Sequence, residues 1–89
     1  MININGSPLR NDIVNVCLTF LESEEPATRY GACKALTLLK ARRAIGVLAY
    51  LSQNDALSSV RRAAKNAAVS FGPDGQAAVQ HHEAKMTNF

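Results

Sequence analysis

The chain has no tryptophan and few aromatic residues, with only two tyrosines and three phenylalanines among 89 residues. Three prolines and five glycines are too few for the frequent turns of a small all-β domain. A chain of this length also excludes an enzyme with separate cofactor and substrate domains. Hydrophobic residues make up 47% and charged residues 19%, so the chain is too apolar for intrinsic disorder. Abundant alanine and leucine therefore predict one all-α domain with an aliphatic core.

Cysteine is scarce as well, and neither Cys17 nor Cys33 belongs to a CxxC pair or has a histidine at a ligand offset. Two buried thiols in a reducing compartment are expected, which predicts a cytoplasmic protein. No stretch approaches the roughly eighteen apolar residues of a membrane span, and residues 1–8 lack the pattern of a secretion signal. We therefore expect neither secretion nor a membrane span.

Acidic residues are nearly absent from the middle of the chain. The net charge of +3 divides into −3 for residues 1–26, +7 for residues 27–72 and −1 for the remainder. In the central block Asp55 is the one acid among eight lysines and arginines. Such a block could meet an acidic protein, nucleic acid or an anionic membrane face.

Apolar residues recur at spacings of three and four, which indicates about five amphipathic helices. Ser7 and Pro8 predict a helix start, as do Ser58 and Asp74 further along, and Gly72 followed by Pro73 predicts a stop. One helical domain is expected over residues 8–85, between an extension at 1–7 and a frayed tail at 86–89. The expected helices run over residues 8–22, 27–39, 44–52, 58–71 and 75–85.

These helices repeat along the chain. At an offset of 32, residues 28–32 align with residues 60–64, Ala35 with Ala67 and Leu39 with Phe71. At an offset of 30 the preceding helices align, and the pairs are Val14 with Ala44, Cys17 with Val47, Leu18 with Leu48 and Leu21 with Leu51. A unit of about thirty residues made of two helices predicts a short α-solenoid of antiparallel helix pairs.

The repeated pattern is Leu-x-x-Leu, an acid in a turn, and then [Val/Thr]-Arg-x-[Gly/Ala]-Ala-x-x-Ala. It resembles the HEAT-like repeats of the short bacterial kind found in phycobilisome-lyase-related proteins, with the best copies at residues 18–39 and 48–71. The resemblance implies an α-solenoid and leaves function open. The family includes bilin lyase subunits, phycobilisome-degradation factors, metal-dependent hydroxylases, DNA glycosylases and adaptors.

Small residues and one arginine recur in each unit. Gly31-Ala32 and Ala63-Ala64 are expected to let their helices approach a neighbour closely. Arg29 and Arg61 stand in the first turns of their helices, where a positive charge opposes the helix dipole and requires a nearby acid. Asp55 and Glu22 or Glu24 are the expected partners, in a structural arginine ladder of the kind that joins units in similar repeats. The alternative is direct ligand contact by the two arginines.

Four further cations have no equivalent acid in the repeat: Arg42, Arg43, Arg62 and Lys65. Arg62 and Lys65 are three residues apart and therefore share one helix face. Three interpretations stay open for this set, namely a solvated face, a site for an acidic protein partner, and a phosphate-backbone site. Tyr30 and Tyr50 are the only interleaved aromatics, and no base-reading motif is present, which argues against nucleic acid.

The one sequence that suggests chemistry is His81-His82-Glu83. His-Glu pairs occur in metal-dependent hydroxylases built on HEAT-like repeats, but those enzymes need several converging pairs, and His82-Glu83 stands alone here. Adjacent helical residues also point about 100° apart, so the triplet cannot form a compact ligand set. We predict no catalytic residues, no metal and no cofactor, and expect a protein that is not an enzyme.

The sequence therefore favours an adaptor or small accessory subunit that binds another, acidic protein through its helical surface. Alternatives are an accessory component of a bilin lyase and, with less support, nucleic-acid backbone binding. About two and a half repeats leave uncovered ends, so the chain is expected to form a homo-oligomer or to dock in a larger assembly. At one end Ile13, Cys17 and Phe20 are expected to be exposed, and the last helix offers little apolar surface at the other.

Overall fold

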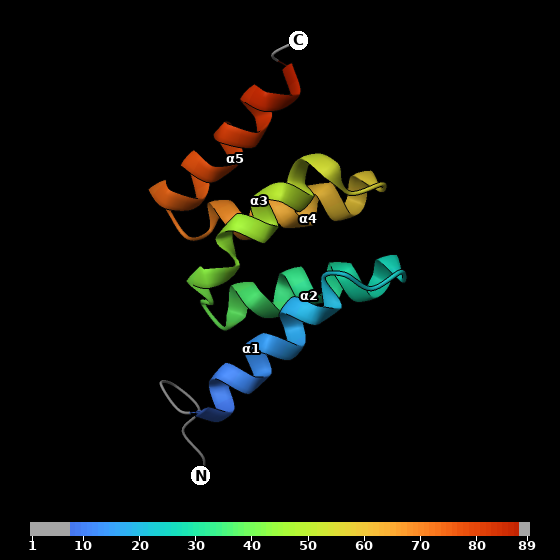
Figure 1. The fold of residues 1–89 in the computed structure, drawn as a ribbon, viewed down its shortest axis with the longest axis vertical. Helices are drawn as coiled ribbons and strands as arrows, with labels where there is room; N and C mark the ends of the chain where they lie inside the picture. Colours follow the sequence, from blue (N-terminus) through green and yellow to red (C-terminus); the bar gives the residue numbers. More distant parts are fainter. Residues whose placement is uncertain (1–7, 88–89) are drawn as a thin grey trace.

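The computed structural model describes the backbone of residues 8–87 and the side chains of residues 8–85. Within those residues it contains five α-helices, one 3-10 turn and no β-strand (Figure 1). The all-α fold with five helices is therefore confirmed. The 3-10 turn spans Arg42–Ala44, and the helices are α1 (Pro8–Phe20), α2 (Pro26–Leu38), α3 (Ile45–Asn54), α4 (Ser58–Val69) and α5 (Pro73–Thr87).

Proline begins α1, α2 and α5, where its missing N–H costs nothing and its fixed φ suits the helix. Two predicted caps are wrong. Leu57, not Ser58, is the N-cap of α4 and makes no side-chain cap bond, while α5 begins at Pro73, so Asp74 lies inside its first turn. The predicted Ser7 cap lies outside the described residues. The tail expected to fray from residue 86 is helical through residue 87.

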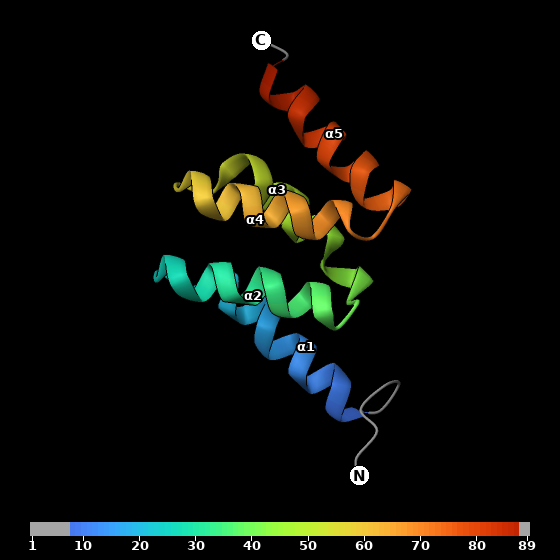
Figure 2. The same cartoon turned by 180° about the vertical axis from the view of Figure 1, so that it is seen from behind.

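The helices stack as two antiparallel pairs, α1 with α2 and α3 with α4. Helices α2 and α4 lie side by side and join the pairs, as Figure 2 shows. Helix α5 packs against α3 and α4 at the end of the stack remote from α1. The molecule measures 51 × 29 × 15 Å along its principal axes, so it is an elongated stack of helices. That these pairs are HEAT-like repeats of a solenoid stays a prediction.

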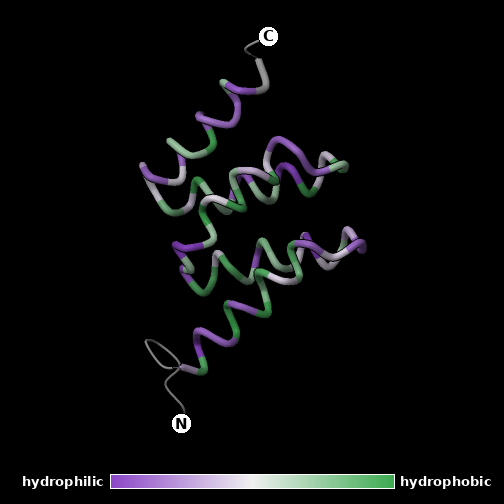
Figure 3. The backbone as a smooth tube through the Cα atoms, in the orientation of Figure 1, coloured by the Kyte–Doolittle hydropathy of each residue, from purple (hydrophilic) through white to green (hydrophobic). Residues whose placement is uncertain are grey.

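The core is aliphatic and rich in alanine, as the composition predicts. Helix α4 buries Val60 and four alanines against its neighbours, which keeps the backbones of α2, α3 and α4 close together. The polar helix α5 also contributes, because its Val79 is only 2% exposed. Figure 3, in which the tube is coloured by residue hydropathy, shows that α1 and α3 are more hydrophobic than α5. The largest fully buried side chains are Leu21, Leu36, Leu48, Val14, Val60, Val79 and Cys33.

Close helix approach depends on a different glycine from the one predicted. Ala32, Ala63 and Ala64 are buried, but Gly31 is exposed, and a Cβ added there would meet nothing within 4 Å. At Gly75 an added Cβ would lie 1.7 Å from the carbonyl oxygen of Ala68. Gly75 therefore lets the first turn of α5 pack directly on the backbone of α4.

Burial supports the predicted alignment of α1 with α3 at its first pair only. Val14 and Ala44, aligned at the offset of 30, are both 0% exposed, whereas Cys17 is buried and its predicted equivalent Val47 is 42% exposed. An offset of 31 aligns Cys17 with Leu48 and Leu21 with Ser52, and all four of these residues are buried. The difference of one residue therefore lies where the 3-10 turn passes into α3, which the apolar spacing does not reveal.

Candidate functional site

The predicted arginine ladder residues come together between the two helix pairs. Arg29, on α2, forms a two-pronged ion pair with Asp55, which follows α3, at Nε–Oδ2 and Nη2–Oδ1 distances of 2.7 and 3.1 Å. Both side chains are largely buried, with exposed fractions of 13% for Arg29 and 3% for Asp55. Of the expected acidic partners, Asp55 is the one that Arg29 contacts, and the bond joins one helix pair to the next.

The two arginines make the same bond to their own turns. Arg29 donates from Nη1 to the carbonyl oxygen of Ser23 at 2.8 Å, and Arg61 donates from Nη1 to that of Asp55 at 2.6 Å. In each case the acceptor lies six residues before the arginine. Asp55 Oδ1 also accepts a hydrogen bond from the N–H of Leu57, which orders the turn into α4. Arg29, Arg61 and Asp55 therefore all make hydrogen bonds that hold the turns and helices of the fold together.

Electrostatics follow from this geometry. The hydrogen bond from Arg29 holds the pKa of Asp55 below its ordinary value, and burial acts in the opposite direction. The bond to Asp55 likewise raises the pKa of Arg29. Burial, with a smaller effect from Asp55, raises the pKa of the Cys33 thiol to about 11. Both cysteines are buried free thiols, which confirms the expected burial and contradicts the exposure expected for Cys17 at the end of the stack. Cys33 is protonated and poorly nucleophilic at neutral pH.

The four cations predicted as a partner site do not form one patch. Arg42 Nη2 lies 2.7 Å from Asp74 Oδ2, and Arg43 donates to the carbonyl oxygen of Asn11 at 3.2 Å, beside α1. Lys65, on α4, lies 3.7 Å from Glu83 of α5. The expectation that no acid accompanies these cations is therefore wrong for Arg42 and Lys65. Arg62 is exposed on the first half of α4, about 10 Å along the helix axis from Val69, where α4 ends before Phe71.

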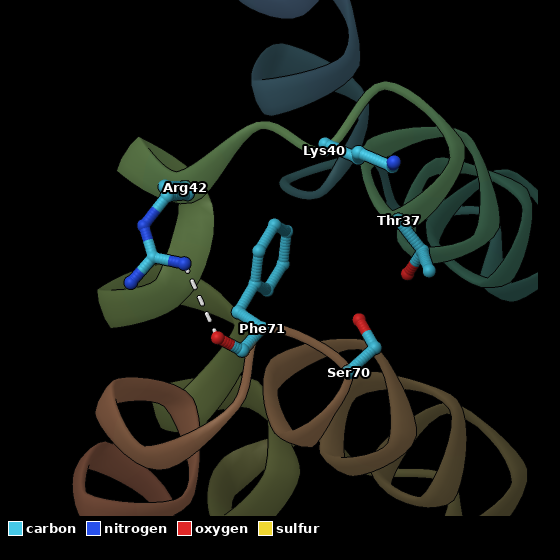
Figure 4. Close-up of a pocket in the computed structure, with 5 residues that line it drawn as sticks. All are labelled: Thr37, Lys40, Arg42, Ser70 and Phe71. Carbon is cyan, nitrogen blue, oxygen red and sulfur yellow. Dashed lines mark hydrogen bonds between the residues drawn. The ribbon is translucent and has the colours of Figure 1, made fainter.

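A pocket of about 390 Å³ lies where α2 and α4 end, and Arg42 lines one side of it (Figure 4). The ring of Phe71 projects into its centre, and the hydroxyl-bearing side chains of Thr37 and Ser70 come from the last turns of the two helices. Polar and apolar surfaces are therefore combined at one place between the helix pairs. The lining residues are Thr37, Lys40, Arg42, Ser70 and Phe71.

The polar groups of the pocket have defined hydrogen-bonding roles. Thr37 donates its hydroxyl proton to the carbonyl oxygen of Cys33 at 2.9 Å, and Ser70 donates to that of Ala67 at 2.5 Å. Both hydroxyl oxygens keep acceptor capacity for a ligand N–H or O–H. Lys40 is exposed, and the Arg42 side chain keeps 56% of its surface exposed despite its bond to Asp74. Two cations therefore flank an aromatic surface and two acceptor oxygens.

Lys40 has an unusual backbone conformation. Its φ is +52°, in the left-handed region that favours glycine, and no other non-glycine residue of the described chain has a positive φ. The bonds from Lys40 N to Thr37 O and from Ala41 N to Leu36 O close a Schellman motif, in which glycine is the usual residue at this position. The repeat offset of 32 aligns Lys40 with Gly72, whose φ is +89°.

The sequence did not single out Lys40, Thr37 or Ser70 as site residues. One available signal was the alignment of Lys40 with Gly72, because a lysine at a glycine position suggests that its side chain is needed there. Non-glycine residues in this conformation are strained and tend to occur at functional sites.

His81, His82 and Glu83 lie on α5. The ring of His82 packs edge-on against Tyr50 of α3 with centroids 6.1 Å apart, and Glu83 faces Lys65. In residues 8–85 no group of three or more His, Cys, Asp or Glu side chains is placed to hold a metal ion. No helix among the described residues combines the length and apolar character needed to cross a membrane.

Comparison of the chain with models of protein families, with curated proteins and with solved structures found no match. The HEAT-like resemblance therefore depends on the repeated residues alone.

Proposed function

We propose that the chain is a non-catalytic interaction module, an adaptor or small accessory subunit, that binds an acidic segment of another protein in the pocket between its helix pairs. The observation that carries this proposal is the combination of Lys40, Arg42 and Phe71 around that pocket. Of the four cations predicted to bind a partner, only Arg42 lines this pocket. Lys40, which the sequence did not single out, lines it as well. Arg43, Arg62 and Lys65 serve as more distant positive charges that attract the same partner.

The chemistry of the pocket favours a segment with a carboxylate next to an apolar side chain. The carboxylate would meet Lys40 and Arg42, while the apolar group would pack on Phe71 and backbone donors would bond Thr37 and Ser70. Asp74 is an exposed acid paired with Arg42, and an exposed pair of this kind contributes little stability. A partner carboxylate can therefore take its place on Arg42 at small cost.

The strained conformation of Lys40 supports the proposal from a second direction. A glycine in the same turn would relieve the strain and would leave the pocket without one of its two cations. A lysine at this position is understandable if its charge contributes to binding.

The resemblance to phycobilisome-lyase-related repeats suggests a phycobiliprotein assembly as the first natural partner to test. A second form of the proposal makes the chain an accessory component of a bilin lyase, which would need a partner chain for catalysis. Both forms use the same pocket, so both predict the same effects of substitutions there.

Fluorescence anisotropy with a labelled peptide of alternating glutamate and leucine would test the proposal. We expect binding that is weakened at least tenfold by Lys40→Glu and by Arg42→Glu. Lys85→Glu is the matched control, because Lys85 is an exposed lysine on α5, away from the pocket lining. Equal weakening by all three variants would show attraction by net charge and would refute a pocket site.

A DNA duplex provides the second arm of the same experiment. Tighter binding of a 20-base-pair duplex than of the peptide, with an affinity that falls steeply with salt, would instead support the nucleic-acid hypothesis. No duplex binding at low salt would remove that hypothesis.

A further inference from the structure

Helix α1 carries an apolar stripe that the other described elements leave largely exposed. Leu9, Val16 and Phe20 are 43%, 51% and 47% exposed, and Ile13, between them along the helix, is partly buried. These four residues, the α1 stripe, are spaced four, three and four apart and therefore lie on one face of the helix. Cys17, predicted to be exposed with them, is instead buried against α2.

The α1 stripe faces away from the rest of the stack. Leu18 packs against the core, and Arg43, just before α3, bonds to the carbonyl oxygen of Asn11, so this side of α1 faces the second helix pair. Leu9 and Leu18 are nine residues apart, which places them on opposite sides of the helix. The stripe thus lies at the outer end of the molecule, where Figure 1 shows α1 remote from α5.

The opposite end of the stack offers no match for this surface. The exposed side chains of α5 are mostly polar, so stacking of α1 on α5 of the next molecule would place apolar groups against polar ones. A second α1 stripe is chemically matched. The exposed residues of α5 up to residue 85 are Pro73, Asp74, Gln76, Ala77, Gln80, His81, Ala84 and Lys85.

The spacing of the stripe permits an antiparallel pair as well as a parallel one. The sequence of intervals four, three and four is the same in both directions, so an antiparallel copy places Leu9 opposite Phe20 and Ile13 opposite Val16. Such a pair has a two-fold axis, so each contact between the copies occurs twice, as in closed dimers of identical chains.

Charge favours the antiparallel orientation. Near the N-terminal end of α1 the charge of Arg10 is balanced by the exposed Asp12, and Arg43 is bonded on the side opposite the stripe, whereas the exposed Glu22, Glu24 and Glu25 follow the C-terminal end. A parallel pair would place the two acidic ends together, and an antiparallel pair keeps them apart.

We propose that two copies of this chain associate through their α1 stripes in an antiparallel, two-fold arrangement. The surface is separate from the pocket residues, so this inference does not rest on the proposed function. A single helix face is smaller than the roughly 800 Å² per partner of stable dimers, which predicts association at tens to hundreds of micromolar.

Sedimentation equilibrium over that concentration range tests the association. We expect a reversible dimer, and Val16→Asp should weaken it at least tenfold while leaving the circular dichroism spectrum and binding of the acidic peptide unchanged. Val69→Asp is the matched control, because Val69 is an exposed valine on α4 and should leave the dimer intact. A monomer throughout the range, or equal loss in both variants, would overturn the proposal.

Disulfide trapping tests the orientation. Leu9→Cys and Phe20→Cys chains should cross-link to each other when mixed under mild oxidation, and each should cross-link poorly alone. Both native cysteines are buried, so they do not compete. Rapid cross-linking within each separate sample, without a gain on mixing, would show a parallel pair and would contradict the antiparallel arrangement.

Discussion

Replacing Lys40 with glycine should make the protein more stable and at the same time weaken its binding to an acidic peptide. The backbone of Lys40 is in the left-handed conformation, which disfavours any residue with a Cβ. The side chain of Lys40 lines the pocket, and the substitution removes its charge. One change therefore separates the contribution of the turn to folding from its contribution to binding.

The magnitude follows from two opposing effects. Relief of the left-handed conformation contributes about 1–2 kcal/mol, while the greater freedom of glycine in the unfolded chain costs about 0.5–1 kcal/mol. The net gain in the free energy of unfolding then lies within about 0–1.5 kcal/mol, with a middle value of about 0.75 kcal/mol. For a domain of this size the middle value raises Tm by about 3–6 °C.

Thermal unfolding followed by circular dichroism measures the first effect, and peptide anisotropy measures the second. Lys40→Ala is the first control, because it removes the charge but keeps the Cβ. It should lose binding without a gain in Tm. Gly72→Ala is the second control, because it introduces a Cβ at the equivalent turn of the next unit and should lower Tm.

Two results would refute the reasoning. An unchanged or lower Tm for Lys40→Gly would mean that the turn stores no strain that glycine can relieve. A gain in Tm with full peptide binding would mean that the Lys40 charge does not contact the partner, and the pocket would lose half of its proposed cation pair.

Gly75→Ala should lower the free energy of unfolding by more than about 2 kcal/mol, because its Cβ would collide with the Ala68 carbonyl and move α5 off α4; an unchanged urea midpoint would contradict the predicted collision. Asp55 has a folded pKa below its ordinary value of 3.8, held there by Arg29, so its stabilising effect is complete above about pH 5 and is lost as pH falls through the folded pKa. Asp55→Asn should therefore unfold more easily at pH 7 and show a smaller further loss between pH 5 and 2 than the parent, and parallel acid profiles would count against this. Cys33, with a pKa raised to about 11, should react with iodoacetamide at pH 8 only upon unfolding, so rapid labelling of the folded protein would show that the thiol is accessible.

The fold was largely predictable because local signals define the helices. The apolar spacing along the chain and the stop predicted at Gly72 and Pro73 place the helices within a few residues of their observed bounds. The errors occur where a tertiary contact decides the outcome. Gly31 matches a packing motif, but whether its helix face meets a neighbour depends on how the pairs stack, and that face is exposed.

The candidate site was only partly predictable, for a related reason. Arg42 was identified from its charge, but its ion pair with Asp74 spans 32 residues and joins segments that become neighbours only after the helices stack. Lys40 lies between two of the expected helices, and nothing in an isolated sequence shows its left-handed backbone conformation. The arginine ladder was recognised from its repetition, yet the acid that Arg29 selects belongs to the next unit.

Asp55 has a consequence for how the molecule fluctuates. Its carboxylate holds the Leu57 amide in the second helix pair, and the same carboxylate is oriented by Arg29 from the first pair. Opening of the seam between the pairs would break the bonds from Arg29, while the bond from Leu57 lies within one turn and can persist without them. Hydrogen exchange at the Arg29 Nε–H should therefore report how often the first helix pair separates from the second, whereas the Leu57 amide reports on the turn alone.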